Sequence, residues 1–252
     1  MKYLSLNAFF NECGAEILKA VRAPEYILPT LILPVAFYAL FTFALPNSGA
    51  NSARYLLATY GVFAVMGPAI FGFGVGVANE RDRGWLKLKR ASPAPSAAYI
   101  GAKIMVTLIF ASLALIPIYL LAGFGADITM ARSAWFMLFG LHLLSVLPFA
   151  LIGLTLGFSF NSNGAIAVSN IFFLGMAALG GLWIPAFLFP TALQKFATTL
   201  PSYQLAEIAL AIVGAPSQSG VDRIPMQNLM IIAIMTIVLA GLAIWAWSRQ
   251  RN

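Results

Sequence analysis

The chain contains few residues of the types that carry out covalent or metal chemistry. Its single cysteine, Cys13, excludes an intrachain disulfide and any metal site that needs several cysteines. Its single histidine, His142, excludes a zinc site built from a histidine cluster. Ser145 follows one helical turn later, and such a pair could serve as a nucleophile and its base. Because no acidic residue lies in the same apolar stretch to orient the histidine, we predict instead a neutral histidine that hydrogen-bonds to a neighbouring helix, with no catalytic residue and no metal site.

Phosphate chemistry has no support in the sequence either. Gly72, Gly74 and Gly76 form a glycine-rich run, but no Lys-Ser or Lys-Thr pair follows them, so the run is not a phosphate-binding loop. The chain contains no Walker motif, and any ATP that drives it must be hydrolysed by another chain. We therefore predict a protein that is not an enzyme and binds no cofactor. The pairs Gly72/Gly76 and Gly153/Gly157 have the spacing of close helix contacts, which we expect within the chain.

The composition assigns the chain to a membrane. Of its 252 residues, 61% are hydrophobic and 9% are charged, whereas soluble domains are about 45–50% apolar and about 25% charged. A soluble core of this size could not hide so much apolar surface. The net charge of +7 is explained by membrane topology and contact with lipid headgroups, so we predict membrane lipids as partners and no nucleic acid.

Charged residues are absent from five long stretches of the chain. A helix needs about 20 apolar residues to cross the hydrocarbon layer. The longest stretch, 133–194, holds two such helices, separated by the polar turn 161–164. We therefore predict an all-α integral membrane protein in a single domain. Its six transmembrane helices are expected at about residues 26–45, 55–78, 101–123, 134–158, 165–183 and 229–247.

The distribution of basic residues orients these spans. Eleven of the 15 Lys and Arg residues fall in the N-terminal segment, the loop after the second span and the C-terminus, and four fall on the other side. The positive-inside rule therefore predicts that both termini are cytoplasmic.

Residues 1–25 fit an amphipathic helix at the inner membrane surface better than a signal peptide or a disordered tail. Apolar residues recur there at helical spacing, and polar residues are turned away from them. The apolar stripe comprises Phe10, Cys13, Ile17 and Val21, and the polar residues are Asn11, Glu12, Glu16 and Lys19.

The cytoplasmic loop 79–99 is the only segment with dense charge. A connection between two spans can be about five residues long, so this one is longer than its path requires. Trp85, Leu86 and Leu88 lie among its charges and need a surface to pack against. Two interpretations remain open: a loop that binds lipid headgroups with Trp85 as an anchor, or a short helix that docks into a soluble partner.

This loop resembles that of the ABC-2 type permeases, the six-helix membrane subunits of bacterial ABC exporters. It carries the run E-R-x-x-G-x-L, followed by basic residues and a small-residue-Pro pair. The segments 180–185 and 200–205 extend the resemblance over essentially the whole chain, although Gln204 stands where the family often has a histidine. The matching loop residues are Glu80, Arg81, Gly84, Leu86, Ser92 and Pro93, with Lys103 entering the third span.

The resemblance implies a permease subunit in the bacterial cytoplasmic (inner) membrane that works as a dimer, for which we expect a second copy of this chain. ATP and Mg²⁺ would bind to separate nucleotide-binding ATPase subunits. The loop would act as the coupling helix that contacts such a subunit. The coupling residues implied are Glu80, Arg81, Arg83, Gly84, Trp85, Leu86, Leu88 and Pro93.

The outer segment 184–227 carries too little charge to lie wholly in water. We predict short helices near 186–199 and 202–213, half-sunk in the outer leaflet, and the resemblance supports a re-entrant region there. An outer gate and a structural plug are both open interpretations of this region. Its expected site residues are Gly180, Gly181, Pro185, Pro201, Tyr203 and Gln204.

The predicted function is a permease subunit of an ATP-driven exporter with an amphipathic or lipid-like cargo. Within the bilayer the spans carry no charged residue, Lys103 lying only at the entrance of the third one, whereas an ion-coupled carrier usually needs such a residue there. The alternative is a stand-alone membrane protein without an ATPase partner: a channel, a lipid-binding scaffold or an intramembrane hydrolase.

Overall fold

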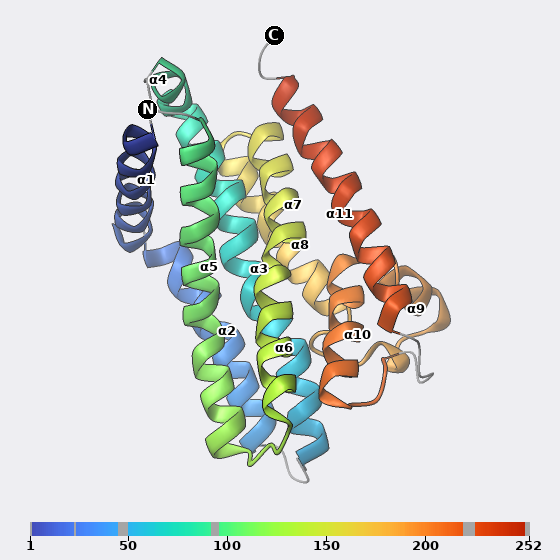
Figure 1. Ribbon diagram of the computed structural model, residues 1–252. Coiled ribbons are helices and arrows are strands. Elements are labelled where there is room, and N and C mark those ends of the chain that lie inside the picture. Colours follow the sequence, from blue (N-terminus) through green and yellow to red (C-terminus); the bar gives the residue numbers. More distant parts are fainter. Residues whose placement is uncertain (1, 23, 45–49, 92–95, 219–224, 250–252) are drawn as a thin grey trace.

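The computed structural model describes residues 2–22, 24–44, 50–91, 96–218 and 225–249, and every regular element in these ranges is a helix (Figure 1). The prediction of an all-α membrane protein is confirmed for this part of the chain. The elements are α1 (Lys2–Arg22), α2 (Pro24–Ala39), η1 (Leu40–Ala44), α3 (Ala50–Asp82), α4 (Trp85–Ala91), α5 (Ser96–Leu120), η2 (Leu121–Gly125), α6 (Arg132–Leu144), α7 (Val146–Ser159), α8 (Ser162–Leu179), η3 (Ala186–Leu188), α9 (Thr191–Ala197), α10 (Pro201–Val213) and α11 (Pro225–Ser248).

Helix α3 is the centre of the bundle. Its 33 residues extend over about 50 Å, and it contacts α2, α5, α7, α8 and α10. In its most apolar stretch 83% of the residues are buried, against 11% in the peripheral helix α11. Lipid tails are as apolar as leucine, so close packing rather than hydrophobicity holds such helices together, and small residues permit that packing.

The second glycine pair brings α3 and α7 into backbone contact. A Cβ atom on Gly153 would lie 2.7 Å from a carbonyl oxygen of α3 and 3.0 Å from the amide nitrogen of Gly74. A Cβ atom on Gly157 would lie 2.6 Å from the carbonyl oxygen of Gly74. This pair therefore packs within the chain, as predicted. Gly72 and Gly76 make no such backbone contact with another helix, since the nearest atom to a Cβ atom at either position would be a side-chain atom 3.5 Å away.

His142 ties α6 to α3 and α5 in the interior of the bundle. Its Nε2 donates to the carbonyl oxygen of Ala58 over 3.1 Å, and its Nδ1 accepts from the hydroxyl of Tyr119 over 2.9 Å. Gly61 leaves the space for the ring, since a Cβ atom there would lie 2.0 Å from it. The hydroxyl of Ser145 donates to the backbone carbonyl four residues earlier. The histidine thus makes the interhelical hydrogen bonds expected of it, and the serine is turned to its own helix.

Five helical stretches of the described chain are long and apolar enough to cross a membrane: α3, α5 with η2, α6 with α7, α8, and α11. The break between α6 and α7 lies just before Pro148, which has no N–H for the preceding turn. The first expected span corresponds to α2 and η1, a shorter apolar stretch with prolines at 29 and 34. Helices α9 and α10 meet at 85°. A multi-pass membrane protein is established, while the number of six spans stays a prediction.

Several helix boundaries differ from the predicted spans, and two of these differences concern polar residues near the candidate site. Helix α3 continues to Asp82, so Glu80 and Arg81 lie in the helix and not in the loop after it. Helix α8 already begins at Ser162, because the side chain of Asn161 caps it by accepting from the Gly164 amide over 2.9 Å. At both boundaries, polar groups that water would otherwise solvate are hydrogen-bonded to side chains, so the helix can extend further than expected.

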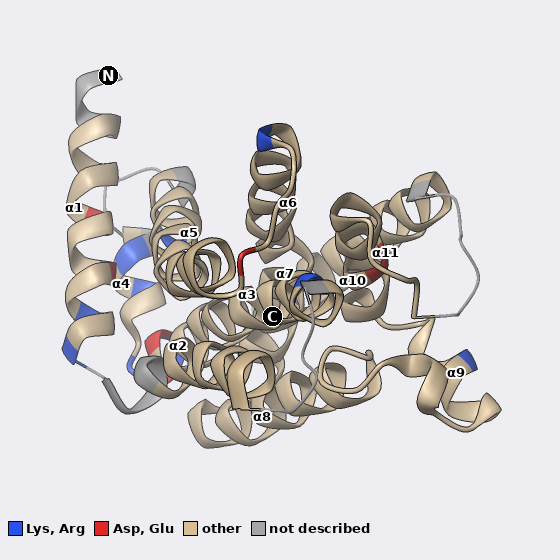
Figure 2. Ribbon diagram, turned by 90° about the horizontal axis from the view of Figure 1, so that it is seen from below, with Lys and Arg blue, Asp and Glu red and all other residues tan. Residues whose placement is uncertain are grey.

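The ends of the helices divide the molecule into two halves. Helix α4, the turn between α7 and α8 and the end of α11 lie at one end of the bundle, and η3, α9 and α10 lie in the opposite half (Figure 1). Helix α1 is seen side-on in the view along the bundle, where α5 is seen nearly end-on (Figure 2). Helix α1 therefore lies at a large angle to the bundle axis. The orientation of these ends in the membrane stays a prediction.

Gly153→Ala is expected to destabilise the protein by about 1–3 kcal/mol, because the added methyl group meets backbone atoms that cannot move away. Thermal unfolding in detergent, followed by circular dichroism, should show a lower midpoint than for the unchanged chain. Gly140→Ala is the matched control, since nothing lies within 4 Å of its Cβ position. Equal midpoints for the two variants would contradict the α3–α7 backbone contact.

Candidate functional site

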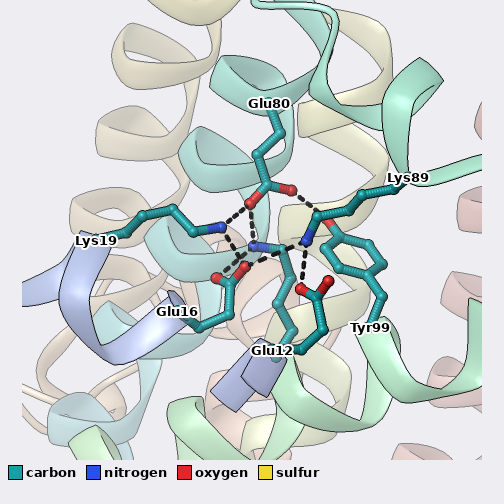
Figure 3. A network of polar contacts seen from close by, with 7 residues as sticks. Glu12, Glu16, Lys19, Glu80, Lys89 and Tyr99 are labelled. Atoms are coloured by element: carbon teal, nitrogen blue, oxygen red, sulfur yellow. Dashed lines mark hydrogen bonds and ion pairs between the residues drawn. The ribbon is translucent and has the colours of Figure 1, made fainter. Parts of the chain in front are cut away.

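A network of charged side chains joins α1, α3, α4 and α5 at the α4 end of the bundle (Figure 3). It contains three carboxylates and three lysines, so its formal charge is balanced, and a tyrosine hydroxyl completes it. The members are Glu12, Glu16 and Lys19 of α1, Glu80 of α3, Lys89 of α4, and Tyr99 and Lys103 of α5.

Glu80 is the most deeply buried carboxylate of this network, with 3% of its surface exposed. It accepts hydrogen bonds from Lys19 and from the hydroxyl of Tyr99, and Lys103 Nζ lies 3.2 Å from its Oε1. A buried charge is tolerated only where partners replace its lost hydration. The first residue of the E-R-x-x-G-x-L run is therefore directed into the bundle.

The other members connect the same four helices. Lys103 Nζ lies 2.9 Å from Glu16 Oε2, and Lys89 Nζ lies 2.6 Å from Glu12 Oε2. For Lys19, burial by itself lowers the pKa, but the adjacent carboxylates Glu80 and Glu16 outweigh it, and the pKa of Lys19 is raised. This lysine therefore remains charged at neutral pH and holds α1 against α3.

Arg81 and Asp82, the two residues that follow Glu80 on α3, bind the turn between α7 and α8. The guanidinium of Arg81 donates to three carbonyl oxygens at the C-terminal end of α7, over 2.6–3.1 Å. The carboxylate of Asp82 accepts from the amide and the hydroxyl of Ser162, both over 2.7 Å, at the N-terminal end of α8. A cation at a helix C-terminus and an anion at an N-terminus both match the helix dipole. Glu80, Arg81 and Asp82 thus connect α3 to four other helices.

After this junction the chain turns and forms α4. Gly84 has φ +75°, a left-handed conformation that most side chains disfavour. Beyond it, Leu86 is half-buried, Trp85 is 39% exposed and Leu88 is 70% exposed. Arg83 is exposed as well. The outer side of α4 therefore presents apolar side chains among charges, and Pro93 lies outside the described residues.

The expected residues of the outer region are brought together by α10. Pro201 is its first residue, and the residues from there to Leu210 are all buried. Gly180 ends α8 at a close contact, because a Cβ atom there would lie 2.1 Å from the hydroxyl of Ser202. Gly181, with φ +76°, then turns the chain.

Tyr203 and Gln204 lie on α10 and are both buried. Tyr203 packs in a small cluster with Ala186 and Ala197, next to the half-buried Pro185 segment. Gln204 donates to the carbonyl oxygen of Thr198 over 2.6 Å and accepts from the amide of Asn228 on α11 over 2.8 Å. The side chain that replaces the family's frequent histidine therefore serves as a hydrogen-bonded link between α9, α10 and α11.

Most partners of Glu80 are not apparent from the sequence. Tyr99 has no signal in the sequence, which places Glu16 only on the polar side of the N-terminal helix, whereas Glu16 is 9% exposed and bound to Lys103. One signal was present: a lysine at the start of an apolar span needs a counter-charge. The sequence does not say which of several acidic residues supplies that charge, because the answer depends on how α1 packs against α5.

Comparisons with known proteins agree with the resemblance seen in the sequence. A family model described as ABC-2 family transporter protein matches residues 19–245, from the end of α1 to α11. The chain is also 30% identical over 223 residues to the "Putative transport permease YvfS" of Bacillus subtilis (strain 168). That alignment covers 86% of this chain and 90% of the relative.

Lys103→Met should destabilise the protein by about 3 kcal/mol, because it removes the buried cation that the carboxylates of Glu16 and Glu80 share. Chemical unfolding in detergent micelles measures this loss. Lys195→Met, at an exposed position of α9, is the matched control and should change stability little.

The double variant Lys103→Met/Glu80→Gln separates pairing from packing. Removing one carboxylate together with the lysine should restore part of the lost stability, so the two effects will not be additive. Strict additivity in this double-mutant cycle would show that Lys103 and Glu80 do not interact.

Proposed function

Given that this chain belongs to the ABC-2 transporter family, we propose that it forms the substrate pathway of an ATP-driven exporter. In this proposal two copies of the chain enclose the pathway, and ATP and Mg²⁺ bind to two separate ATPase subunits. The chain itself is a multi-pass membrane subunit of a transporter. We place it in the bacterial cytoplasmic membrane with six spans and with α4 and both termini on the cytoplasmic side.

The attachment of α4 to the bundle carries this proposal. Glu80, Arg81 and Asp82 end the central helix α3 and bind to α1, α5, α7 and α8, directly before the chain enters α4. Lys89 of α4 itself is paired with Glu12 of α1. A force on α4 would therefore move these helices together and would not be absorbed by a flexible loop. In this proposal Glu80 acts by positioning α4, since its side chain is buried.

Exposed residues of α4 are the proposed contact with the ATPase. Leu88 and Trp85 project from a helix that also bears cations, a combination that fits a groove on a soluble protein. When ATP draws two ATPase subunits together, their movement would tilt α2, α3 and α8 as rigid bodies and alternate access across the membrane. The lack of charged residues in the middle of the spans agrees with an external source of energy.

For the outer region we propose a fixed closure of the pathway. The burial of α10 from Pro201 to Leu210 and the link from Gln204 to Asn228 favour a packed plug over a mobile lid. Opening would then require movement of α11 or α3 and not of α10 alone.

Purification of the tagged chain from its native membranes tests the proposal. We expect an ATPase to co-purify and its hydrolysis of ATP to be detectable in the preparation. Leu88→Ser should lower this co-purified activity about tenfold, since an exposed apolar anchor is lost from an interface centre. Its thermal midpoint should stay unchanged.

Leu188→Ser is the control, because Leu188 is similarly exposed but lies in the outer half of the molecule. Full ATPase recovery with Leu88→Ser would exclude α4 as the docking helix. Absence of any ATPase from the unchanged chain, together with transport by the purified chain alone, would support a stand-alone membrane protein instead.

A further inference from the structure

A cavity of about 610 Å³ lies between α1, α2, α3, α5 and α8, beside the charged network. On α3 it extends from Gly67 to Glu80, a length of about 20 Å. One leaflet of a bilayer contributes about 15 Å of hydrocarbon. The cavity is therefore long enough for an alkyl chain of a membrane lipid.

The two ends of the cavity differ in chemistry. Its deeper walls carry apolar side chains such as Phe71, Val106 and Phe110. Gly72 and Gly76 add no side chain to the α3 wall, which keeps the space open. An elongated, largely apolar space of this kind suits an alkyl chain, and Thr30 and Thr107 are the polar side chains beside it.

Positive charge is in excess in the lining of the cavity. Four cations and two carboxylates line the cavity, and ion pairs gather the two lysines and both carboxylates at the end of α3 that precedes α4. Two of the cations are the lysines that pair with Glu16 and Glu80. Arg22 and Arg83 remain, and within the described chain neither has an ion-pair partner. Guanidinium groups bind phosphate and carboxylate through paired hydrogen bonds.

We propose that this cavity binds an anionic amphiphile, with its phosphate or carboxylate head at Arg22 and Arg83 and an alkyl chain along the glycine face of α3. Trp85 lines the head end, where its ring suits the boundary between polar and apolar surroundings. Binding needs no ATPase and no second copy of the chain, so this inference is tested independently of the proposed function.

Native mass spectrometry of the full chain in a nonionic detergent provides the test. We expect tighter binding of palmitoyl-oleoyl phosphatidylglycerol than of the zwitterionic phosphatidylcholine with the same chains. The variant Arg22→Gln/Arg83→Gln should weaken phosphatidylglycerol binding at least about tenfold, as expected for lost charge-assisted hydrogen bonds. Arg132→Gln/Arg249→Gln removes the same charge from exposed positions outside the cavity and should leave binding unchanged.

A second variant tests the place of the alkyl chain. At Gly72 a Cβ atom would meet only the Thr107 hydroxyl, at 3.5 Å, so Gly72→Leu fills the cavity without a backbone clash. We expect it to weaken phosphatidylglycerol binding about tenfold with an unchanged thermal midpoint, whereas Gly140→Leu, at another open position, should have no effect.

Three outcomes would overturn the proposal. Equal binding of the two lipids would indicate unspecific lipid contact. Equal loss in both double arginine variants would indicate a general charge effect. Binding of glycerol 3-phosphate as tight as that of phosphatidylglycerol would identify a site for a free phosphate, in which the apolar part of the cavity has no function.

Discussion

Buried charge has to be paired, and at the end of α3 this requirement organises the whole α4 end of the molecule. Glu80, Arg81 and Asp82 are consecutive residues of one helix, so their side chains diverge by about 100° from one residue to the next. Each one meets a different partner: the lysines of α1 and α5, the carbonyl end of α7 and the amide end of α8. One helical turn with three charges therefore fixes five helices relative to one another.

The same requirement explains the unusual orientation of α1. In a soluble protein the apolar side of such a helix would face the core. Here Phe10 and Val21 are about two-thirds exposed, at 64% and 65%, while Glu16 is buried against α5. This arrangement is favourable when the surroundings are lipid, because the outer side of α1 is then solvated by hydrocarbon and the inner side by counter-charges.

The two halves of the molecule solve the burial of polar groups differently. In the half with α10, Ser202 and Gln204 bond to backbone carbonyls and to a side-chain amide, and the buried carboxylate of Glu207 accepts from the Ser217 hydroxyl and the backbone amide of Gln218. In the half with α4, buried carboxylates are paired with lysines, and a cavity lies beside them. Hydrogen bonds to the protein's own backbone favour a fixed structure, whereas a cavity lined by cations without ion-pair partners in the described chain favours contact with other molecules.

The sequence alone determined that the chain is a helical membrane protein, since 61% hydrophobic and 9% charged residues leave no other solvent. The density of charge along the chain also identified the loop after the second span, and the motif of this loop carries the resemblance to the family. Partners far apart in the chain were decided only by tertiary structure. Gly153 packs against the backbone of α3, whereas Gly72, in the same type of pair, borders a cavity. Glu80, read as a loop residue that contacts another subunit, is buried against Lys103. Spacing along the chain shows which residues share a helix face, but the element that this face meets depends on how all the helices pack together.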